Sequence, residues 1–273
     1  MKLILFLILF LTAAHQSMHP SPFRLMTYNI RYNTPNDGPN WWEKRKEKVF
    51  TLIEAHAPDV LGVQEAVHSQ MLDLDSFLIN YDYYGVGRAD GKTGGEYAAV
   101  FFNKNKLKLL DSGTFWLSEQ PDEIASVGWD ASMERICSWV KLEEIKSEKT
   151  FFVFNAHFDH IGKEARKNSA ILIVDQINKI TENEPVVLMG DLNFTPDEVP
   201  FSIILESGFK DVFGGIEKVR TFTGFEVKDA ESKRIDYIFT NEKIKVKGCL
   251  IDDRNDGQYF PSDHLPVLAD VVF

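Results

Sequence analysis

Nine polar residues of this chain have the chemical types needed to hydrolyse a phosphate ester, and most of them follow short apolar segments. They are Asn29, Glu65, Glu96, His157, Asp191, Asn193, Asp236, Asp263 and His264. A strand that ends in a carboxylate, an amide or an imidazole places that group at the edge of a sheet. If several such ends converge, hard oxygen ligands for a divalent cation lie beside two histidines. This is the equipment for metal-assisted attack of water on a phosphate ester.

The segment GDLN (190–193) carries an acid and an amide two residues apart at the end of an apolar run. At a strand end Asp191 and Asn193 point the same way. One of them then orients a nucleophilic water while the other holds a phosphate oxygen or the metal. Gly-Asp-x-Asn is also good turn chemistry, so this motif alone is a modest signal. The segment PSDH (261–264) likewise allows two interpretations, part of the site or a turn that contains an ordinary histidine.

Two histidines need acidic partners if they are buried. Asp236 interrupts an apolar strand, where an acid costs stability unless it is paired. A pair between His264 and Asp236 removes that cost and keeps the imidazole charged, or in one tautomer. His157 has the same requirement, with Glu96 as its expected partner. Asp159 and His160 follow directly in the chain and either extend the site or are exposed turn residues.

The elements that must position these residues alternate between strands and helices in each half of the chain. Antiparallel-looking strand pairs lie between the two halves, so we expect an α/β (α+β) fold with two sheets packed face to face and helices outside. The predicted helices are 42–56, 69–78, 163–180 and 201–205. The predicted strands are 23–30, 60–63, 97–102, 107–117, 136–142, 150–155, 185–189, 234–239, 244–250 and 267–272.

The bulk composition favours one large domain with a leader peptide. The chain has 273 residues, 44% of them hydrophobic, and no internal linker rich in Gly, Ser or Pro divides it. A basic start at Met1-Lys2 precedes the apolar run LILFLILFL and Thr12-Ala13-Ala14. This resembles a secretory signal peptide over residues 1–20, which leaves residues 21–273 as the domain. We therefore expect export to the periplasm or the medium; an uncleaved tether or a buried strand is the alternative.

The net charge and the two cysteines bear on nucleic-acid binding and on disulfide formation. The formal net charge is −11 and the pI is near 5.1, so the chain lacks the broad positive field that sequence-independent nucleic-acid binding uses. This weakens a nuclease function without excluding it. Cys137 and Cys249 both lie in strand-like runs, and we interpret them as small buried residues, although export permits a disulfide.

The motifs taken together resemble the endonuclease/exonuclease/phosphatase superfamily across residues 23–273. They are TYN (27–29), QE (64–65), GEY (95–97), NAHFD (155–159), GDLN (190–193), RIDY (234–237) and SDHLP (262–266). The sequences of several segments most resemble those of an exported bacterial branch near the nocturnin-like deadenylases. The resemblance implies a four-layer α/β sandwich of the DNase I type, with two mainly antiparallel sheets. NAHFDH departs from many relatives, which have Thr and Leu in place of Ala156 and Phe158.

The resemblance also implies a metal and a water position. Glu65 is the expected principal ligand of Mg²⁺, with Mn²⁺ as the alternative ion. Asn29 lies close by, and Asp263 completes or bridges the metal sphere. Asp191 orients or deprotonates the attacking water, and Asn193 supports it.

Phosphate binding is assigned to histidines and arginines. His157 and His264 bind the scissile phosphate and stabilise charge on its oxygens, while Glu96 and Asp236 hold the two imidazoles. Guanidinium groups suit phosphate well, and three of them flank motif segments. Surface salt bridges are the alternative role for Arg31, Arg135 and Arg166.

The sequence therefore predicts an exported Mg²⁺-dependent phosphoesterase that acts by direct attack of water. Nuclease or 3′–5′ exonuclease action is one form of this activity. Hydrolysis of small-molecule phosphates, inositol phosphates or phospholipid headgroups is the alternative, and a non-catalytic binding module is a third. The expected partner is the phosphate-ester substrate itself, whether nucleic acid, nucleotide, inositol phosphate or lipid headgroup. We expect a monomer without a stable protein partner.

Overall fold

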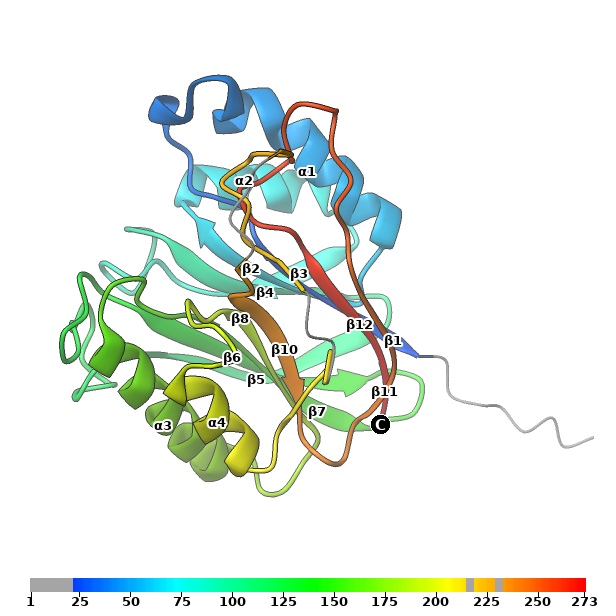
Figure 1. Ribbon diagram of the computed structural model, residues 1–273. Coiled ribbons are helices and arrows are strands. Elements are labelled where there is room, and N and C mark those ends of the chain that lie inside the picture. Colours follow the sequence, from blue (N-terminus) through cyan, green and yellow to red (C-terminus); the bar gives the residue numbers. More distant parts are fainter. Residues whose placement is uncertain (1–21, 215–218, 229–232) are drawn as a thin grey trace, which may run out of the picture.

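Two six-stranded sheets pack face to face, and helices cover their outer faces (Figure 1). The computed structural model describes residues 22–214, 219–228 and 233–273. The predicted signal peptide lies outside these residues. Within them, no helix combines the length and apolar character needed to cross a membrane. The four-layer arrangement confirms the predicted fold class.

The first sheet has the strand order β11-β12-β1-β2-β4-β3. Its strands β1 and β2 are parallel, and its other neighbouring pairs are antiparallel. Helices α1 (Trp42–His56) and α2 (His68–Phe77) lie outside it, and a 3₁₀ segment (Pro35–Asn40) precedes α1. The strands are β1 (Phe23–Asn29), β2 (Val60–Ala66), β3 (Tyr81–Tyr84), β4 (Tyr97–Asn103), β11 (Lys245–Ile251) and β12 (Val267–Val272).

The second sheet has the order β5-β6-β7-β8-β10-β9, with β7 and β8 parallel and the other pairs antiparallel. Helices α3 (Lys163–Ile180) and α4 (Val199–Glu206) cover its outer face. The strands are β5 (Leu107–Trp116), β6 (Ile136–Glu144), β7 (Thr150–His157), β8 (Val186–Asp191), β9 (Lys210–Asp211) and β10 (Asp236–Thr240).

Three apolar layers explain why both sheets are buried on two faces. Between the sheets, side chains such as Val60, Val153 and Ile238 form the central core. One outer cluster joins α1 and α2 to the first sheet, and another joins α3 and α4 to the second. Strands buried on both faces read as continuous apolar runs, which is why their polar ends stand out in the sequence.

Strand register brings the polar ends together. His157 is paired with Asp191 where parallel strands β7 and β8 end, and Asp236 is paired with the same Asp191 from antiparallel β10. Asn29 is likewise paired with Gln64, the residue before Glu65, at the end of β1. The edge of each sheet therefore presents part of one site.

Candidate active site

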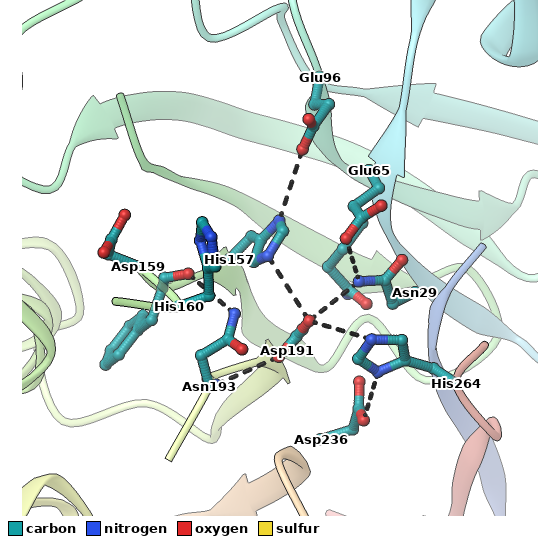
Figure 2. Close-up of polar contacts among 12 residues, drawn as sticks. Asn29, Glu65, Glu96, His157, Asp159, His160, Asp191, Asn193, Asp236 and His264 are labelled. Atoms are coloured by element: carbon teal, nitrogen blue, oxygen red, sulfur yellow. Dashed lines mark hydrogen bonds and ion pairs between the residues drawn. The ribbon is translucent and has the colours of Figure 1, made fainter. Parts of the chain in front are cut away.

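A cleft of about 820 Å³ opens at the edge where the two sets of strand ends meet. Seven of the nine predicted site residues line it, namely Glu65, Glu96, His157, Asp191, Asn193, Asp263 and His264. The other two, Asn29 and Asp236, are fully buried behind this lining and hydrogen-bond to residues in it. The structure thus gathers all nine residues around one cleft, and Figure 2 labels all of them except Asp263.

Asn29 links the two sheets at the centre of the site. Its Nδ2 donates to Glu65 Oε1 at 3.0 Å and to Asp191 Oδ2 at 2.9 Å. Glu65 has a φ of +63° and sits at a bulge in β2, where the register with β4 shifts. A left-handed residue at a bulge re-aims a side chain, and here it turns the carboxylate towards Asn29. The backbone N–H of Tyr32 donates to the other Glu65 oxygen at 3.2 Å.

Three side chains have the spacing of metal ligands. One donor atom each from Glu65, Asp191 and His264 lies within 4.8 Å of the others. Burial raises the pKa of Asp191 to about 7, and the neighbouring carboxylates of Asp236 and Glu65 act in the same direction. Burial also raises the pKa of Asp263, which lines the same cleft. Buried carboxylates that repel one another are the donor chemistry that a hard divalent cation stabilises, so these residues fit such an ion.

His264 lies on one wall of the cleft, next to the carboxylates of Asp236 and Asp191. Its Nδ1 is 2.8 Å from Asp236 Oδ2, which is the pairing predicted from the sequence, and its Nε2 is 3.6 Å from Asp191 Oδ2. Burial opposes protonation of the ring, but Asp236 and Asp191 outweigh it and raise the pKa of His264 well above its ordinary value. These two carboxylates therefore favour the protonated form of the ring. The Phe222 ring meets it edge-on, with centroids 5.1 Å apart.

His157 stands on the opposite wall and has a different partner. Arg135 Nη1 donates to its Nε2 at 2.9 Å, and burial together with Arg135 lowers the pKa of His157 well below its ordinary value. The predicted partner Glu96 lies 3.8 Å from Nδ1, which is an ion-pair distance and too long for a hydrogen bond. Arg88 holds the Glu96 carboxylate with two bonds of 2.8 and 2.9 Å. Sequence reasoning missed Arg88, because nothing in its loop distinguishes it from a surface arginine.

Asp159 and His160 extend this wall. Asp159 is 1% exposed and accepts hydrogen bonds from Ser132 and from the backbone N–H groups of Ile161 and Gly162. Burial opposes its ionisation, but these bonds lower the pKa of Asp159 to about 2. His160 is exposed and lines the cleft, with its Nδ1 2.8 Å from Arg135 Nη2.

Asn193 serves both as a turn residue and as part of the cleft lining. It has a φ of +50°, its backbone N–H donates to Asp191 Oδ1 at 3.1 Å, and its Nδ2 donates to the Phe158 carbonyl at 3.0 Å. Gly190 lies just before, where β8 passes so close to β7 that a Cβ would sit 1.9 Å from the Ala156 carbonyl oxygen. The glycine of this motif is thus required by packing, and the turn and site interpretations hold together.

The three predicted phosphate-binding arginines all line the cleft, and each also has an acidic partner. Arg31 pairs with Asp37 at 3.1 Å, and Arg166 pairs with Glu198 at 3.0 Å. Arg135 reaches Asp159 at 3.4 Å. Arginine that is paired with an acid inside a cleft keeps its position and leaves some N–H groups for a ligand.

Both cysteines are free. Cys137 lies in β6 of the second sheet and is fully buried, whereas Cys249 lies in β11 of the first sheet and is partly exposed. No disulfide joins them. The interpretation as small buried residues is confirmed for Cys137 and holds only in part for Cys249, which is partly exposed.

Comparison with known proteins places this cleft in a family. Residues 26–264 match the endonuclease/exonuclease/phosphatase family. A family protein of Bacteroides vulgatus is 39% identical, with a TM-score of 0.86 over 93% of this chain and 100% of that one. A mannosyl-6-phosphatase of Bacteroides thetaiotaomicron is 33% identical, with a TM-score of 0.83 over 92% of this chain and 100% of that one. Human nocturnin is 24% identical over 94% of this chain and 66% of its own length.

These matches confirm the superfamily predicted from the motifs, including its nocturnin-like relatives. The match with the family covers residues 26–264, a range that contains all nine predicted site residues. The chain belongs to the endonuclease/exonuclease/phosphatase family, a family of phosphoric ester hydrolases.

Proposed function

We propose that the protein is an exported, Mg²⁺-dependent phosphoesterase that hydrolyses a small-molecule phosphate ester by direct attack of water. The observation that carries this proposal is the convergence of Glu65, Asp191 and His264 within 4.8 Å in a cleft that arginines also line. The carboxylate oxygens of Glu65 and Asp191 suit Mg²⁺ better than softer metals.

The residues divide the work according to their charge. Glu65 and Asp191 would hold the cation, and Asp263 lines the same cleft outside this ligand group; when bound, the cation would neutralise charge on the phosphoryl group. Asp191 and Asn193 orient the attacking water, because both face the cleft at the end of β8. The imidazolium of His264 donates to a phosphoryl oxygen, since preorganised charge is the largest contribution to phosphoryl transfer.

Charge pairing favours a small substrate over a polynucleotide. The chain has a net charge of −11, and the cleft arginines Arg31, Arg88 and Arg166 are each paired with an acid. A continuous basic groove, which backbone binding of nucleic acid requires, does not arise from paired charges. The likeness to a mannosyl-6-phosphatase supports a sugar phosphate as the substrate class.

Hydrolysis of RNA is the second candidate. It is favoured by the similarity to a Ccr4 exoribonuclease subunit of Emericella nidulans, which is 23% identical over 84% of this chain and 47% of that protein. This chain spans less than half of that relative, so segments beyond the shared part are lacking from the comparison.

A substrate panel tests the proposal. Mannose 6-phosphate, glucose 6-phosphate, bis-p-nitrophenyl phosphate, sphingomyelin, inositol phosphates and single-stranded RNA would be incubated with Mg²⁺, with Mn²⁺ and with EDTA. We expect release of phosphate from sugar phosphates with Mg²⁺ and none with EDTA. Faster cleavage of RNA than of every small ester would establish the second candidate, and metal-independent activity would contradict the proposed chemistry.

Export rests on the sequence of residues 1–20 alone. Expression of the full chain in a bacterial host, followed by mass spectrometry of the periplasmic fraction, tests it. A mature N-terminus after Ala14 or a few residues later is the expected result, and an intact Met1 on a cytoplasmic product would contradict it.

A further inference from the structure

One buried guanidinium contacts two imidazole rings on the His157 wall. Arg135 is 4% exposed, and its Nη1 lies 2.9 Å from His157 Nε2 while its Nη2 lies 2.8 Å from His160 Nδ1. Its Nε points to Asp159 Oδ2 at 3.4 Å. Three N–H groups of the same side chain therefore have three different partners, and the Asp159 carboxylate holds the guanidinium in place.

The chemistry of arginine decides where the protons of both rings lie. A guanidinium has five N–H donors and no acceptor, and it stays protonated in proteins. A ring nitrogen that hydrogen-bonds to it must accept, so that nitrogen carries no proton. In a neutral imidazole the proton then lies on the other nitrogen.

We propose that Arg135 sets His157 and His160 in opposite tautomers, so that His160 rather than His157 offers the cleft an N–H donor from its Nε2. In His157 the acceptor is Nε2 and the proton lies on Nδ1, the nitrogen that faces Glu96 at 3.8 Å. In His160 the acceptor is Nδ1 and the proton lies on Nε2.

His160 is suited to bind an oxyanion on this wall. It is exposed, it lines the same cleft as Asp191 and His264, and its Nε2 has no hydrogen-bond partner among residues 22–214, 219–228 and 233–273. His157, by contrast, has its Nε2 lone pair directed at Arg135. The ligand class is a phosphate oxygen, or a hydroxyl oxygen of the leaving group. That choice of ligand rests on the proposed function, whereas the proton positions do not.

Nitrogen NMR reads the tautomers directly. The protein labelled with ¹⁵N-histidine would be studied in Mg²⁺-containing buffer at neutral pH, with resonances assigned through His157→Asn and His160→Asn. We expect the His157 ring to be protonated at Nδ1 only and the His160 ring at Nε2 only. A His157 ring protonated at Nε2 would overturn the proposal.

Substitution of Arg135 provides the matched comparison. In Arg135→Met the rings of His157 and His160 should each lose the single tautomer that Arg135 imposes. Arg166→Met is the control: it removes another buried guanidinium of the cleft that contacts neither ring, and both tautomers should stay unchanged. Arg135→Lys is the second variant, because lysine keeps the positive charge but lacks the planar fork whose two ends bond the two rings, and we expect at least one ring to change. Unchanged tautomers in a folded Arg135 variant would show that Arg135 does not set them.

Binding of inorganic phosphate tests His160 as the donor. Glutamine places an amide N–H near the position of Nε2, and asparagine places one near Nδ1. Calorimetry with Mg²⁺ should show about tenfold weaker phosphate binding for His160→Asn and a smaller loss for His160→Gln. Wild-type affinity in His160→Asn would remove His160 from the site, and equal losses in both variants would contradict the Nε2 position. Neither measurement needs turnover, so failure of the proposed function would be recognised separately.

Discussion

Two histidines flank Asp191 at nearly equal distances, yet their pKa values are shifted in opposite directions. The Nε2 atoms of His157 and His264 lie 3.5 and 3.6 Å from Asp191 Oδ2, and the residues are 6% and 4% exposed. His264 bonds to the carboxylate of Asp236, which raises its pKa and favours the protonated ring; His157 bonds to Arg135, which lowers its pKa and favours the neutral ring. Because distance and burial match, the charged neighbours account for the difference: the carboxylates of Asp236 and Asp191 raise the pKa of His264, whereas Arg135 and Arg88 lower that of His157.

This difference indicates that the two walls contribute different things to catalysis. An imidazolium stabilises negative charge as it develops on the phosphoryl group. A neutral imidazole held by a guanidinium positions its neighbours and leaves the cationic role to Arg135. The site is therefore electrostatically asymmetric around Asp191, although its sequence motifs look alike.

The largest expected effect comes from removing each ring in turn. His264→Gln keeps an N–H near the position of Nε2 but removes the positive charge, and kcat should fall about 10³-fold. His157→Gln removes a neutral ring, so kcat should fall only about tenfold. Steady-state kinetics on the best substrate of the panel would measure both.

Circular dichroism spectra and melting temperatures serve as the controls for these two variants. Both side chains are buried, so a misfolded variant must be separated from an inactive one. Equal losses of kcat in two folded variants would contradict the asymmetry of the walls.

The second prediction concerns the pH at which the imidazolium is lost. Asp236 raises the pKa of His264 through both charge and a hydrogen bond, so Asp236→Asn should lower that pKa. The protonated form is then lost at a lower pH, and the alkaline limb of the kcat profile should move down by about one pH unit or more. Glu96→Gln is the matched change on the other wall and should leave this limb in place. An unmoved limb in Asp236→Asn would show that His264 is not the group that titrates.

Much of the fold was readable from the sequence because most elements carry long periodic patterns. The predicted helices 42–56 and 163–180 agree with α1 and α3 at both ends. Strands β3 and β9 were missed because four and two residues are too few to show alternation. Strand β10 begins at Asp236, two residues after the predicted start, because its partner strand β8 ends at Asp191, the residue paired with Asp236.

The site was readable in part, for a physical reason. Burying an unpaired acid in an apolar strand costs free energy, so a partner for Asp236 could be expected, and His264 was the partner predicted. Arg135 was predicted as a phosphate-binding arginine because it flanks a motif segment, but nothing in the sequence indicates its contact with His157. Only the register of β6 against β7, in which Cys137 pairs with Ala156, brings Arg135 beside His157. Long-range register is what single-sequence reasoning lacks.

The third prediction concerns the carboxylate between the two walls. Without metal, the folded-state pKa of Asp191, about 7, lies above its ordinary value of 3.8, so the folded protein binds this proton more tightly than the unfolded chain. The associated stability is complete below about pH 4 and is lost as the pH rises through 7, by roughly 1–3 kcal/mol. Mg²⁺ should reverse the loss, and its effect should be larger at pH 8 than at pH 5, because the ligands must be deprotonated.

Urea unfolding with EDTA or with Mg²⁺ at these two pH values measures the effect. Asp191→Asn removes the titrating group, so its stability in EDTA should fall less between pH 5 and pH 8 than that of the wild type. An equal pH dependence in the variant would assign the effect to other groups. A Mg²⁺ effect that is the same at both pH values would show that the cation does not bind through Asp191.

The smallest expected effect concerns an aromatic ring present on one wall only. Phe222 meets His264 edge-on at 5.1 Å, and no aromatic ring within the described part of the chain has a corresponding contact with His157. Phe222→Leu keeps apolar volume beside His264 but removes the ring, so kcat should fall two- to fivefold, with the alkaline limb of its pH profile almost unchanged, since Asp236 and Asp191 set the charge. Phe225→Leu changes a buried ring eight per cent exposed that does not contact either histidine, and it serves as the control. If Phe222→Leu moved the alkaline limb as far as Asp236→Asn does, the charge of His264 would depend on the enclosure of the ring as much as on its carboxylates.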